Sequence, residues 1–283
     1  MKKKIHERLK GMHARKLTSL LNKGERIYGT AIVSTSPFWP SVVKQTGIDF
    51  VFLDTEHIPL DRHTLSWMCQ TYNALNLPSI VRIPNPDPFE ACKVLDGGAC
   101  GIIAPYIESA DQVRDLIGAT KFRPLKGKRL KKILNGHEAM ESELKQYLEE
   151  RNADTVLWIN IESMPALNSL DEIVAVKGLD GLIIGPHDLS CSMGLPEQYT
   201  HPQFEKTVLH IISSARDKSL AVGIHFTGAL DLQIKWAKAG ANIILYSSDI
   251  SLFSQALQRG ISQIRIALGE KSEKFEEEGN III

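Results

Sequence analysis

The stretch "DFVFLDTEHIPLDRHTLSWMCQTYNALNLPSIVRI" (49–83) holds two short apolar runs, 49–54 and 79–83, separated by a longer amphipathic segment. Runs that are almost continuously apolar are typical of parallel strands covered on both faces. The segment between them begins with Asp61 as a candidate N-cap, and its apolar side chains recur at helical spacing over 61–74. The stretch therefore predicts a strand–helix–strand unit of a parallel sheet.

The same unit recurs along the chain. Eight apolar runs are separated by helix-like segments: 27–33, 49–54, 79–83, 101–106, 155–161, 181–185, 221–226 and 242–247. Eight strands alternating with helices over about 250 residues predict an α/β fold of the (β/α)8 TIM barrel type, with a doubly wound open sheet as the structural alternative. No stretch has the composition of a linker, so we expect a single domain over 1–283, with its core at about 26–268 and extensions at both ends.

Helix signals in the remaining segments support this alternation. Asp87 is a candidate N-cap, and "SADQ" (109–112) has the pattern of a capping box. The longest gap between strands, 107–154, contains a basic stretch that we interpret as a loop over 121–132 and a predicted helix over 138–151.

Apolar residues after the eighth strand recur at helical spacing and predict an extra C-terminal helix. They are Phe253, Leu257, Ile261, Ile264 and Leu268. Exposed apolar residues of this kind indicate a surface for a partner, so we expect a homo-oligomer. The tail over 270–283 is charged and then apolar, and we interpret it as a frayed or partner-contacting extension.

Composition argues against several classes of protein. The 33 basic and 33 acidic residues give no net charge, so we expect neither nucleic acid nor a membrane as a partner. No apolar run approaches the roughly 18 residues of a membrane span. The basic N-terminus lacks the apolar segment of a secretory signal. The four cysteines include no CxxC pair, which favours reduced thiols in a cytoplasmic protein.

Ionisable residues stand where five of the eight predicted strands stop. They are Asp54, Glu56 and His57 after the second strand, Arg82 in the third, Glu162 after the fifth, Asp188 after the sixth and His225 in the seventh. In a (β/α)8 barrel the carboxyl ends of all strands meet at one rim, where catalytic residues lie. The pattern therefore predicts an active site at this rim.

Each of these residues also has a purely structural interpretation. Asp54 could cap a turn, and His57 could be an exposed loop residue. Arg82 could belong to a buried ion pair, because an unpaired guanidinium in an apolar strand is costly. Glu162 and Asp188 could complement the dipoles of the helices that follow them. The prediction of a site therefore depends on the joint pattern and not on any one residue.

The residue types suit enolate chemistry. Carboxylates from two adjacent strands, Glu162 and Asp188, suit a hard divalent cation such as Mg²⁺ or Mn²⁺. An arginine beside such an ion can stabilise an oxyanion, and a histidine with a carboxylate neighbour can move a proton. The backbone amides of "GPHDLS" (185–190) suit a substrate carboxylate. This set predicts enolate chemistry on a 2-oxo acid and leaves lyase, isomerase and hydrolase open.

Four motifs together resemble the metal-dependent (class II) pyruvate aldolases of the HpcH/HpaI family, which includes 4-hydroxy-2-oxoheptanedioate and 2-dehydro-3-deoxyglucarate aldolases. The motifs are "FVFLDTEHIPLD" (50–61), "IVRIPNPDPFEACKVLDGGACGIIAPYIESADQ" (80–112), "NIES" (160–163) and "DGLIIGPHDLS" (180–190). The resemblance implies a barrel of the phosphoenolpyruvate/pyruvate type, assembled as a homohexamer or trimer with an exchanged C-terminal helix. It also implies reversible cleavage of a 4-hydroxy-2-oxo acid to pyruvate and an aldehyde, with Mg²⁺, Mn²⁺ or Co²⁺ as cofactor.

The resemblance further implies a role for each matching residue. Glu162 and Asp188 match the metal ligands, and Arg82 matches the arginine that stabilises the pyruvate enolate. His57 matches the acid/base histidine, with Asp96 as its carboxylate partner from the same or a neighbouring subunit. Asp96 could instead simply close its helix before a glycine turn.

Other positions are assigned to the substrate by the same resemblance. Asp54 matches an aspartate near the aldehyde end of the site. Gly185, Pro186 and His187 match the turn whose backbone receives the pyruvate carboxylate. Asn160 stands where the family usually has glutamine, so its shorter amide is expected to bind pyruvate differently or through a water molecule.

The segment "RPLKGKRL" (123–130) also departs from the family pattern "PPxGxRG", since Leu130 replaces the last glycine. Two other functions stay open at this point. The chain could be an acyl-CoA lyase related to citrate and malyl-CoA lyases, with the basic loop over 121–132 meeting a CoA phosphate. It could also be a non-catalytic barrel that serves binding or assembly.

Overall fold

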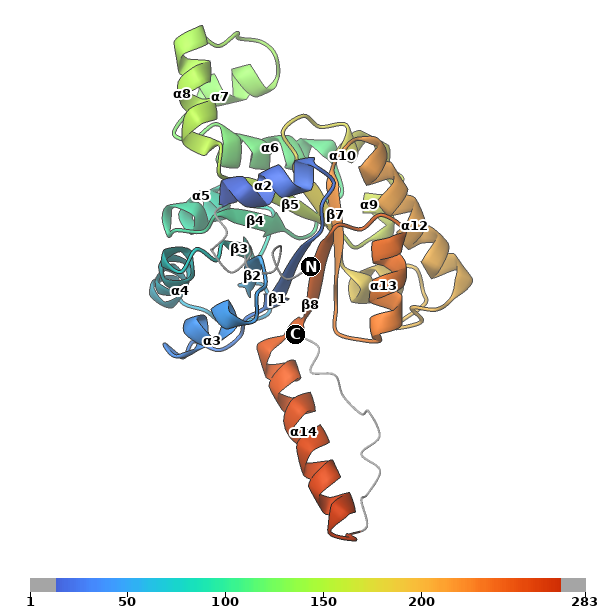
Figure 1. Ribbon diagram of the computed structural model, residues 1–283. Coiled ribbons are helices and arrows are strands. Elements are labelled where there is room, and N and C mark those ends of the chain that lie inside the picture. The colour runs from blue at the N-terminus through green and yellow to red at the C-terminus, as the bar shows by residue number, and fades with distance from the viewer. Residues whose placement is uncertain (1–13, 271–283) are drawn as a thin grey trace.

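The computed structural model describes residues 14–270, which form a closed barrel of eight parallel strands surrounded by helices (Figure 1). The strands are β1 (Ile27–Ala31), β2 (Phe50–Asp54), β3 (Ser79–Arg82), β4 (Gly101–Ala104), β5 (Val156–Ile161), β6 (Gly181–Ile184), β7 (Ala221–Phe226) and β8 (Ile243–Ser248). Each strand pairs with the next along the chain, and β8 pairs with β1 through the register of Tyr28 with Ile244. The predicted (β/α)8 barrel is confirmed, and each of the eight predicted runs overlaps a strand.

Helices connect the strands on the outside of the barrel (Figure 1). They are α2 (Ala14–Asn22), α3 (Trp39–Gln45), α4 (Arg62–Ala74), α5 (Pro88–Asp96), α6 (Ala110–Lys121), α7 (Gly127–Leu134), α8 (Ser142–Asn152), α9 (Met164–Asn168), α10 (Leu170–Val174), α11 (Pro186–Ser192), α12 (Pro202–Asp217), α13 (Leu230–Lys238) and α14 (Asp249–Ala267). The predicted caps are confirmed: Asp61 caps α4, Asp87 caps α5, and Ser109 with Gln112 forms the capping box of α6.

Apolar side chains fill both the space under the helices and the inside of the barrel. Phe50 and Trp158 are buried inside the barrel, and their rings meet edge to face with centroids 5.4 Å apart. Leu17 and Leu21 of α2 belong to the same apolar cluster, so α2 covers the amino-terminal end of the barrel. The opposite end, where the strands stop, contains a cavity of about 610 Å³.

The connection between β4 and β5 differs from the prediction. The prediction of a loop over 121–132 is wrong from Gly127 onward, because α7 begins there. Leu130 and Leu134, four residues apart, lie against Gly118 of α6, which explains why this basic segment is helical. The helix expected over 138–151 is present as α8, and both helices project from the barrel beyond α6 (Figure 1).

The predicted C-terminal helix is α14, which extends away from the barrel (Figure 1). Its buried residues are Asp249 and Ser251, in its first turn. The predicted apolar stripe, in contrast, is between 42% and 71% exposed: Phe253, Leu257, Ile261, Ile264 and Leu268. The tail predicted over 270–283 lies outside the described residues from 271 onward. Among the described helices, none is both long and apolar enough to cross a membrane.

Gly223 in β7 leaves no room for a side chain. A Cβ there would lie 2.2 Å from the carbonyl oxygen of Ile243 on β8 and 2.6 Å from its Cβ. We expect Gly223→Ala to lower the free energy of unfolding, measured by urea denaturation, by about 1–3 kcal/mol, the usual cost of overpacking. In the control Gly260→Ala, the new methyl group meets no atom within 4 Å. This control should gain up to about 1 kcal/mol from helix propensity. Equal losses in both variants would contradict the packing argument.

Candidate active site

A buried ion pair joins the ends of β2 and β3. Asp54 and Arg82 are register partners on these strands. Nε and Nη2 of Arg82 donate hydrogen bonds of 2.8 Å and 2.5 Å to the two carboxylate oxygens of Asp54. Glu56 Oε2 lies 3.1 Å from the same Nε. The guanidinium is therefore held by two carboxylates while Arg82 still lines the cavity.

The charge of this pair is maintained against its burial. Burial alone would raise the pKa of Asp54, but the hydrogen bonds and positive charge of Arg82 outweigh this effect and lower the pKa below its ordinary value. Burial likewise disfavours the charged guanidinium, but Asp54 and Glu56 raise the pKa of Arg82. Both groups are therefore ionised at neutral pH. Arg82 thus belongs to a buried ion pair, as its purely structural interpretation predicted.

Glu162 and Asp188 flank Gly185 at the ends of β5 and β6. A Cβ at Gly185 would lie 3.0 Å from Glu162 Oε2 and 3.7 Å from Asp188 Oδ2. Glu162 Oε1 accepts a hydrogen bond of 2.7 Å from the backbone N–H of Tyr106, and Oε2 accepts one of 2.7 Å from Asn160 Nδ2. Burial raises the pKa of Glu162, and the negative charge of Asp188 adds to this effect. The two carboxylates thus share a small, partly desolvated space.

The backbone of Tyr106 has an unusual conformation and donates a hydrogen bond to Glu162. Its φ is 55°, in the left-handed region, where a residue other than glycine costs on the order of 1–3 kcal/mol. This conformation directs its N–H to Glu162. A hydrogen bond to the Glu56 carboxylate raises the pKa of the Tyr106 hydroxyl to about 12. Tyr106 therefore connects Glu56 with Glu162 at the rim.

These carboxylates fit the predicted divalent cation. They are hard oxygen donors in a partly desolvated space, and their mutual repulsion would be relieved by a cation. Asn160 Oδ1 is buried without a hydrogen-bond partner and lies on the cavity wall, which leaves one more oxygen acceptor nearby. Within residues 14–270 no group of three or more His, Cys, Asp or Glu is arranged to hold a metal ion. A cation bound by Glu162 and Asp188 would therefore keep positions for water or substrate oxygens.

Two histidines line the cavity in different environments. The side chain of His57 is 45% exposed, and its Nε2 lies 3.7 Å from Glu56 Oε2. His225 is instead enclosed, with Nε2 3.2 Å from the carbonyl oxygen of Ser247. Burial, followed by the charge of Arg82, lowers the pKa of His225 to about 4. His225 is therefore neutral at neutral pH, and His57 is the more accessible of the two.

The structure does not bring Asp96 to this site. Asp96 is the last residue of α5, and its carboxylate accepts a hydrogen bond of 3.0 Å from Arg123 Nη1. Helix α5 starts at the rim after β3 and runs along the barrel, so its last residue lies far from His57 of the same chain. Within one chain, the pairing of Asp96 with His57 is wrong, and His57 pairs with Glu56. A contribution of Asp96 to a neighbouring subunit stays a prediction.

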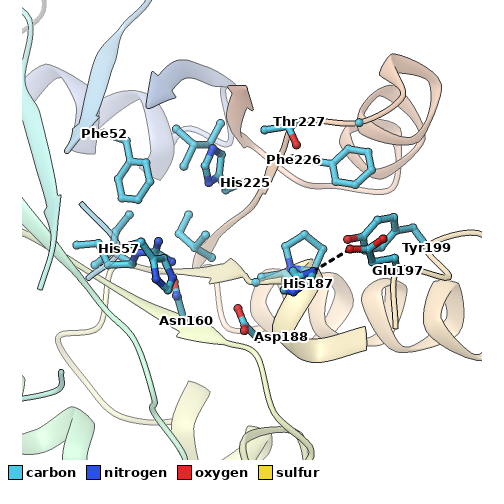
Figure 2. A pocket seen from close by; sticks show the side chains of 18 residues that line it. Phe52, His57, Asn160, His187, Asp188, Glu197, Tyr199, His225, Phe226 and Thr227 are labelled. Carbon is cyan, nitrogen blue, oxygen red and sulfur yellow. Dashed lines mark ion pairs between the residues drawn. The ribbon is translucent and has the colours of Figure 1, made fainter. Parts of the chain in front are cut away.

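The cavity brings most of the predicted residues together (Figure 2). Those lining it are His57, Arg82, Asn160, Gly185, Pro186, His187 and Asp188. Asp54 and Glu162 lie behind them and hold Arg82 and Asn160 by hydrogen bonds. The cavity wall also includes residues that sequence reasoning missed, namely Glu197, Tyr199 and Thr227. Glu197 and Tyr199 lie in the irregular segment before α12, where no strand end or motif marked them.

Comparison with known proteins identifies the family. A family model described as HpcH/HpaI aldolase/citrate lyase matches residues 32–256. The chain belongs to this family. A 2-keto-3-deoxy-L-rhamnonate aldolase from Klebsiella pneumoniae subsp. pneumoniae is 30% identical over 256 residues, covering 90% of this chain and 94% of that protein. The protein of the same name from Escherichia coli O157:H7 is 30% identical over 250 residues, covering 87% of this chain and 91% of that protein.

Solved structures share the architecture. An HpcH/HpaI aldolase/citrate lyase family protein from Burkholderia cenocepacia J2315 aligns with a TM-score of 0.76 and 26% identity, covering 89% of this chain and 99% of that one. The citrate synthase SbnG aligns with a TM-score of 0.76 and 26% identity, covering 90% of this chain and 99% of that one. The predicted family and the predicted enzyme class, an aldolase and thus a carbon–carbon lyase, are confirmed.

Replacing Asp54 by Asn should expose the dependence of the fold on its charge. Because the pKa of Asp54 is lowered in the folded protein, its stabilising contribution is present above the ordinary value of 3.8 and is lost as the pH falls through the folded pKa. Breaking a buried pair costs about 3–5 kcal/mol. We expect Asp54→Asn to lose this much at pH 7 in urea unfolding, and the difference from the parent to shrink below pH 4 (roughly the ordinary carboxyl pKa).

The control for this experiment is Asp111→Asn. Asp111 pairs with Arg114 on the surface of α6, and its side chain is 87% exposed. Exposed pairs contribute only about 0–1 kcal/mol, so this variant should match the parent closely at every pH. A loss in Asp54→Asn that stays constant down to acidic pH would show that the side chain matters for its shape and not for its charge.

Proposed function

We propose that this protein is a divalent-metal-dependent aldolase that reversibly cleaves a 4-hydroxy-2-oxo acid into pyruvate and an aldehyde. The observation that supports this most directly is the combination at one rim of a fixed arginine, Arg82, with the carboxylates of Glu162 and Asp188. A positively charged donor beside a cation site suits an oxygen that becomes negative during the reaction. Membership of an aldolase family agrees with this chemistry.

Glu162 and Asp188 would hold the metal, with Mg²⁺, Mn²⁺ or Co²⁺ as candidates. Such an ion, when bound, supplies positive charge that stabilises an enolate oxygen. The remaining orientation comes from the chain itself. Tyr106 N–H and Asn160 Nδ2 each occupy one oxygen of Glu162, so this carboxylate cannot rotate freely.

The substrate would lie across the cavity with its carboxylate at the turn of Gly185, Pro186 and His187. The 2-oxo oxygen would then face Arg82, whose guanidinium is oriented by Asp54 through two hydrogen bonds. The guanidinium stabilises the negative charge that forms on this oxygen.

His57 is proposed to move the protons. It would accept the proton of the 4-hydroxyl group as the bond between C3 and C4 breaks and the aldehyde leaves. The electron pair of that bond forms the enolate of pyruvate, whose oxygen lies beside Arg82. A proton then returns to C3 and gives pyruvate. His57 is exposed enough to exchange its proton with solvent between these steps, and the Glu56 carboxylate lies 3.7 Å from its Nε2.

Proton exchange of pyruvate tests enolate formation without knowledge of the aldehyde. Loss of the methyl-proton NMR signal in D₂O should require Mg²⁺ or Mn²⁺ and should stop with EDTA. His57→Ala should slow the exchange. Arg82→Ala should slow it about a hundredfold or more, the usual cost of removing one oxyanion donor.

Arg114→Ala, a surface substitution on α6, is the matched control and should exchange like the parent. Circular dichroism should accompany Arg82→Ala, because this change also leaves Asp54 buried and unpaired. Absence of exchange with every metal would refute the proposed function and turn attention to CoA thioesters. Exchange that survives in a folded Arg82→Ala variant would remove Arg82 from the mechanism.

We also propose that the protein is a homo-oligomer, a trimer or a hexamer, located in the cytoplasm. The exposed apolar stripe on α14 supports association, because large exposed apolar patches on soluble proteins usually mark contacts. Asp96 is exposed, so a neighbouring subunit could present it to His57. The described cysteines are free thiols, including the exposed Cys191, which suits a reducing compartment.

Replacing Leu257 and Ile264 together by Ser should weaken the assembly. Both side chains are more than half exposed on α14, so the change should cost little in the fold of the subunit. The mass measured by light scattering should fall toward that of the 31.5 kDa chain. Gln258→Ser on the same helix is the control and should keep the parent mass. A parent that is already monomeric would contradict the proposed oligomer.

A further inference from the structure

A second cavity lies between α6, α7 and α10, outside the catalytic one. It has a volume of about 340 Å³ and shares no lining residue with the catalytic cavity. Phe122 and Val176, which line it, stand just after the last residues of α6 and α10. The helices of a (β/α)8 barrel run back from the catalytic rim, so this α6–α7–α10 cavity lies toward the opposite end of the barrel (Figure 1). A ligand bound there would not touch the residues of the proposed reaction.

Apolar side chains form most of the wall of the α6–α7–α10 cavity. They are Ile117, Phe122, Ile133, Leu134 and Val176. Phe122, Ile133 and Val176 are only partly buried, so apolar surface is open to a ligand. The volume lies near the lower end of the roughly 300–1,000 Å³ of small-molecule sites, which are mostly apolar with a few polar groups. The cavity therefore suits a small ligand with an apolar body.

Packing and hydrogen bonds hold these walls in place. Helix α7 lies so close to α6 at Gly118 that a Cβ there would be 2.9 Å from Leu134 Cδ1. Asn152 of α8, which is 3% exposed, donates hydrogen bonds of 3.0 Å and 2.9 Å from Nδ2 to the backbone carbonyl oxygens of the two residues that flank Phe122. The cavity is thus formed by packed helices and a fixed connection between them.

The charged side chains that line the cavity are two cations and one anion. They are Arg114, Lys177 and Glu172. Arg114 pairs with Asp111 on the surface of α6. Lys177 is exposed and forms no ion pair with another residue in the range 14–270. Its ammonium group is therefore available to an acidic group of a ligand.

The basic stretch 121–136, which includes α7, adds positive charge around the cavity. It contains seven basic residues and no acidic one. Within the described chain, four carboxylates pair with this stretch: Asp96, Glu138, Glu141 and Asp180. Positive charge therefore stays in excess beside the apolar wall, and it favours an anionic ligand over a cationic one.

We propose that the α6–α7–α10 cavity binds a small amphipathic carboxylate, whose apolar body lies against Phe122, Ile133 and Val176 and whose acid group meets Lys177. Burial of the apolar body supplies most of the affinity, because each buried methylene group contributes more than a typical exposed ion pair does. The charge then selects among apolar ligands of similar size. This binding does not depend on the proposed aldol reaction.

Isothermal titration calorimetry of the full-length protein with three probes tests this proposal. Octanoate has the proposed chemistry, octylamine has the same chain with the opposite charge, and acetate lacks the apolar body. The parent should bind octanoate more tightly than octylamine by about fivefold or more, the upper range for an exposed ion pair. It should bind acetate at least about tenfold more weakly than octanoate. The preference for octanoate over octylamine should fall as the salt concentration rises.

Substitutions in the cavity wall locate the bound probe. Ile133→Glu should weaken octanoate binding by about tenfold or more, because it places a like charge on the apolar wall. Lys177→Gln should lower the preference for octanoate over octylamine, and Glu172→Gln should raise it. Lys145→Gln is the matched control, since Lys145 lies on α8, pairs with Glu149 and does not line the cavity. This control should bind all three probes as the parent does.

A parent that does not bind octanoate would overturn the proposal. Octanoate binding that is unchanged in both Ile133→Glu and Lys177→Gln would also overturn it, since the probe would then bind elsewhere, for example in the catalytic cavity. If Ile133→Glu fails to fold, Lys177→Gln and Glu172→Gln still test the site, because both change exposed side chains and should shift the preference in opposite directions. An Ile133→Glu variant of lower mass in light scattering, together with a parent that binds no octanoate, would show that a second copy of the chain covers the cavity instead.

Discussion

The ion pair between Asp54 and Arg82 is the interaction on which the rim depends. A guanidinium inside an apolar sheet is tolerated only with a well-placed counterion, and adjacent strands in register supply one here. The pair costs desolvation energy, so its value lies in position more than in stability. It fixes the direction of the Arg82 guanidinium through two hydrogen bonds. Glu56, two residues after Asp54 in the chain, lies 3.1 Å from Nε of the same guanidinium.

The rim contains more negative than positive charge, and this imbalance shapes its chemistry. Glu56 and Glu162 lie near Arg82, whose charge is already shared with Asp54, and Asp188 lies near Glu162. Burial and the neighbouring carboxylates raise the pKa of Glu162, because both disfavour the ionised form of its carboxyl group. A divalent cation would relieve the repulsion between these carboxylates. The same cation, placed near the 2-oxo oxygen, would act in the direction in which Arg82 acts, so both would stabilise one developing charge.

Sequence reasoning succeeded where a residue's position follows from a repeating element. The eight strands were visible because each is a continuous apolar run, and Arg82 or Asp188 could be assigned to the rim because parallel strands end on the same side. It failed where position depends on packing between helices or on irregular chain. The helix α7 was missed because its lysines obscured the spacing of Leu130 and Leu134. Asp96 matched a motif, but a motif does not say to which subunit's site a residue at a helix end belongs.

The missed residue Glu197 shows why part of a site escapes such reasoning. Groups that act on the reacting bonds must be rigid, so they stand on strand ends, where the sequence pattern reveals them. Groups that recognise the variable part of a substrate stand on loops, which can change without disturbing the barrel. Glu197 lies on an irregular loop that is nevertheless fixed to α11 by hydrogen bonds of the buried Ser190 hydroxyl. The geometry of this loop depends on the two hydrogen bonds of Ser190 and on the left-handed backbone of Glu197, and neither feature has a periodic signature in the sequence.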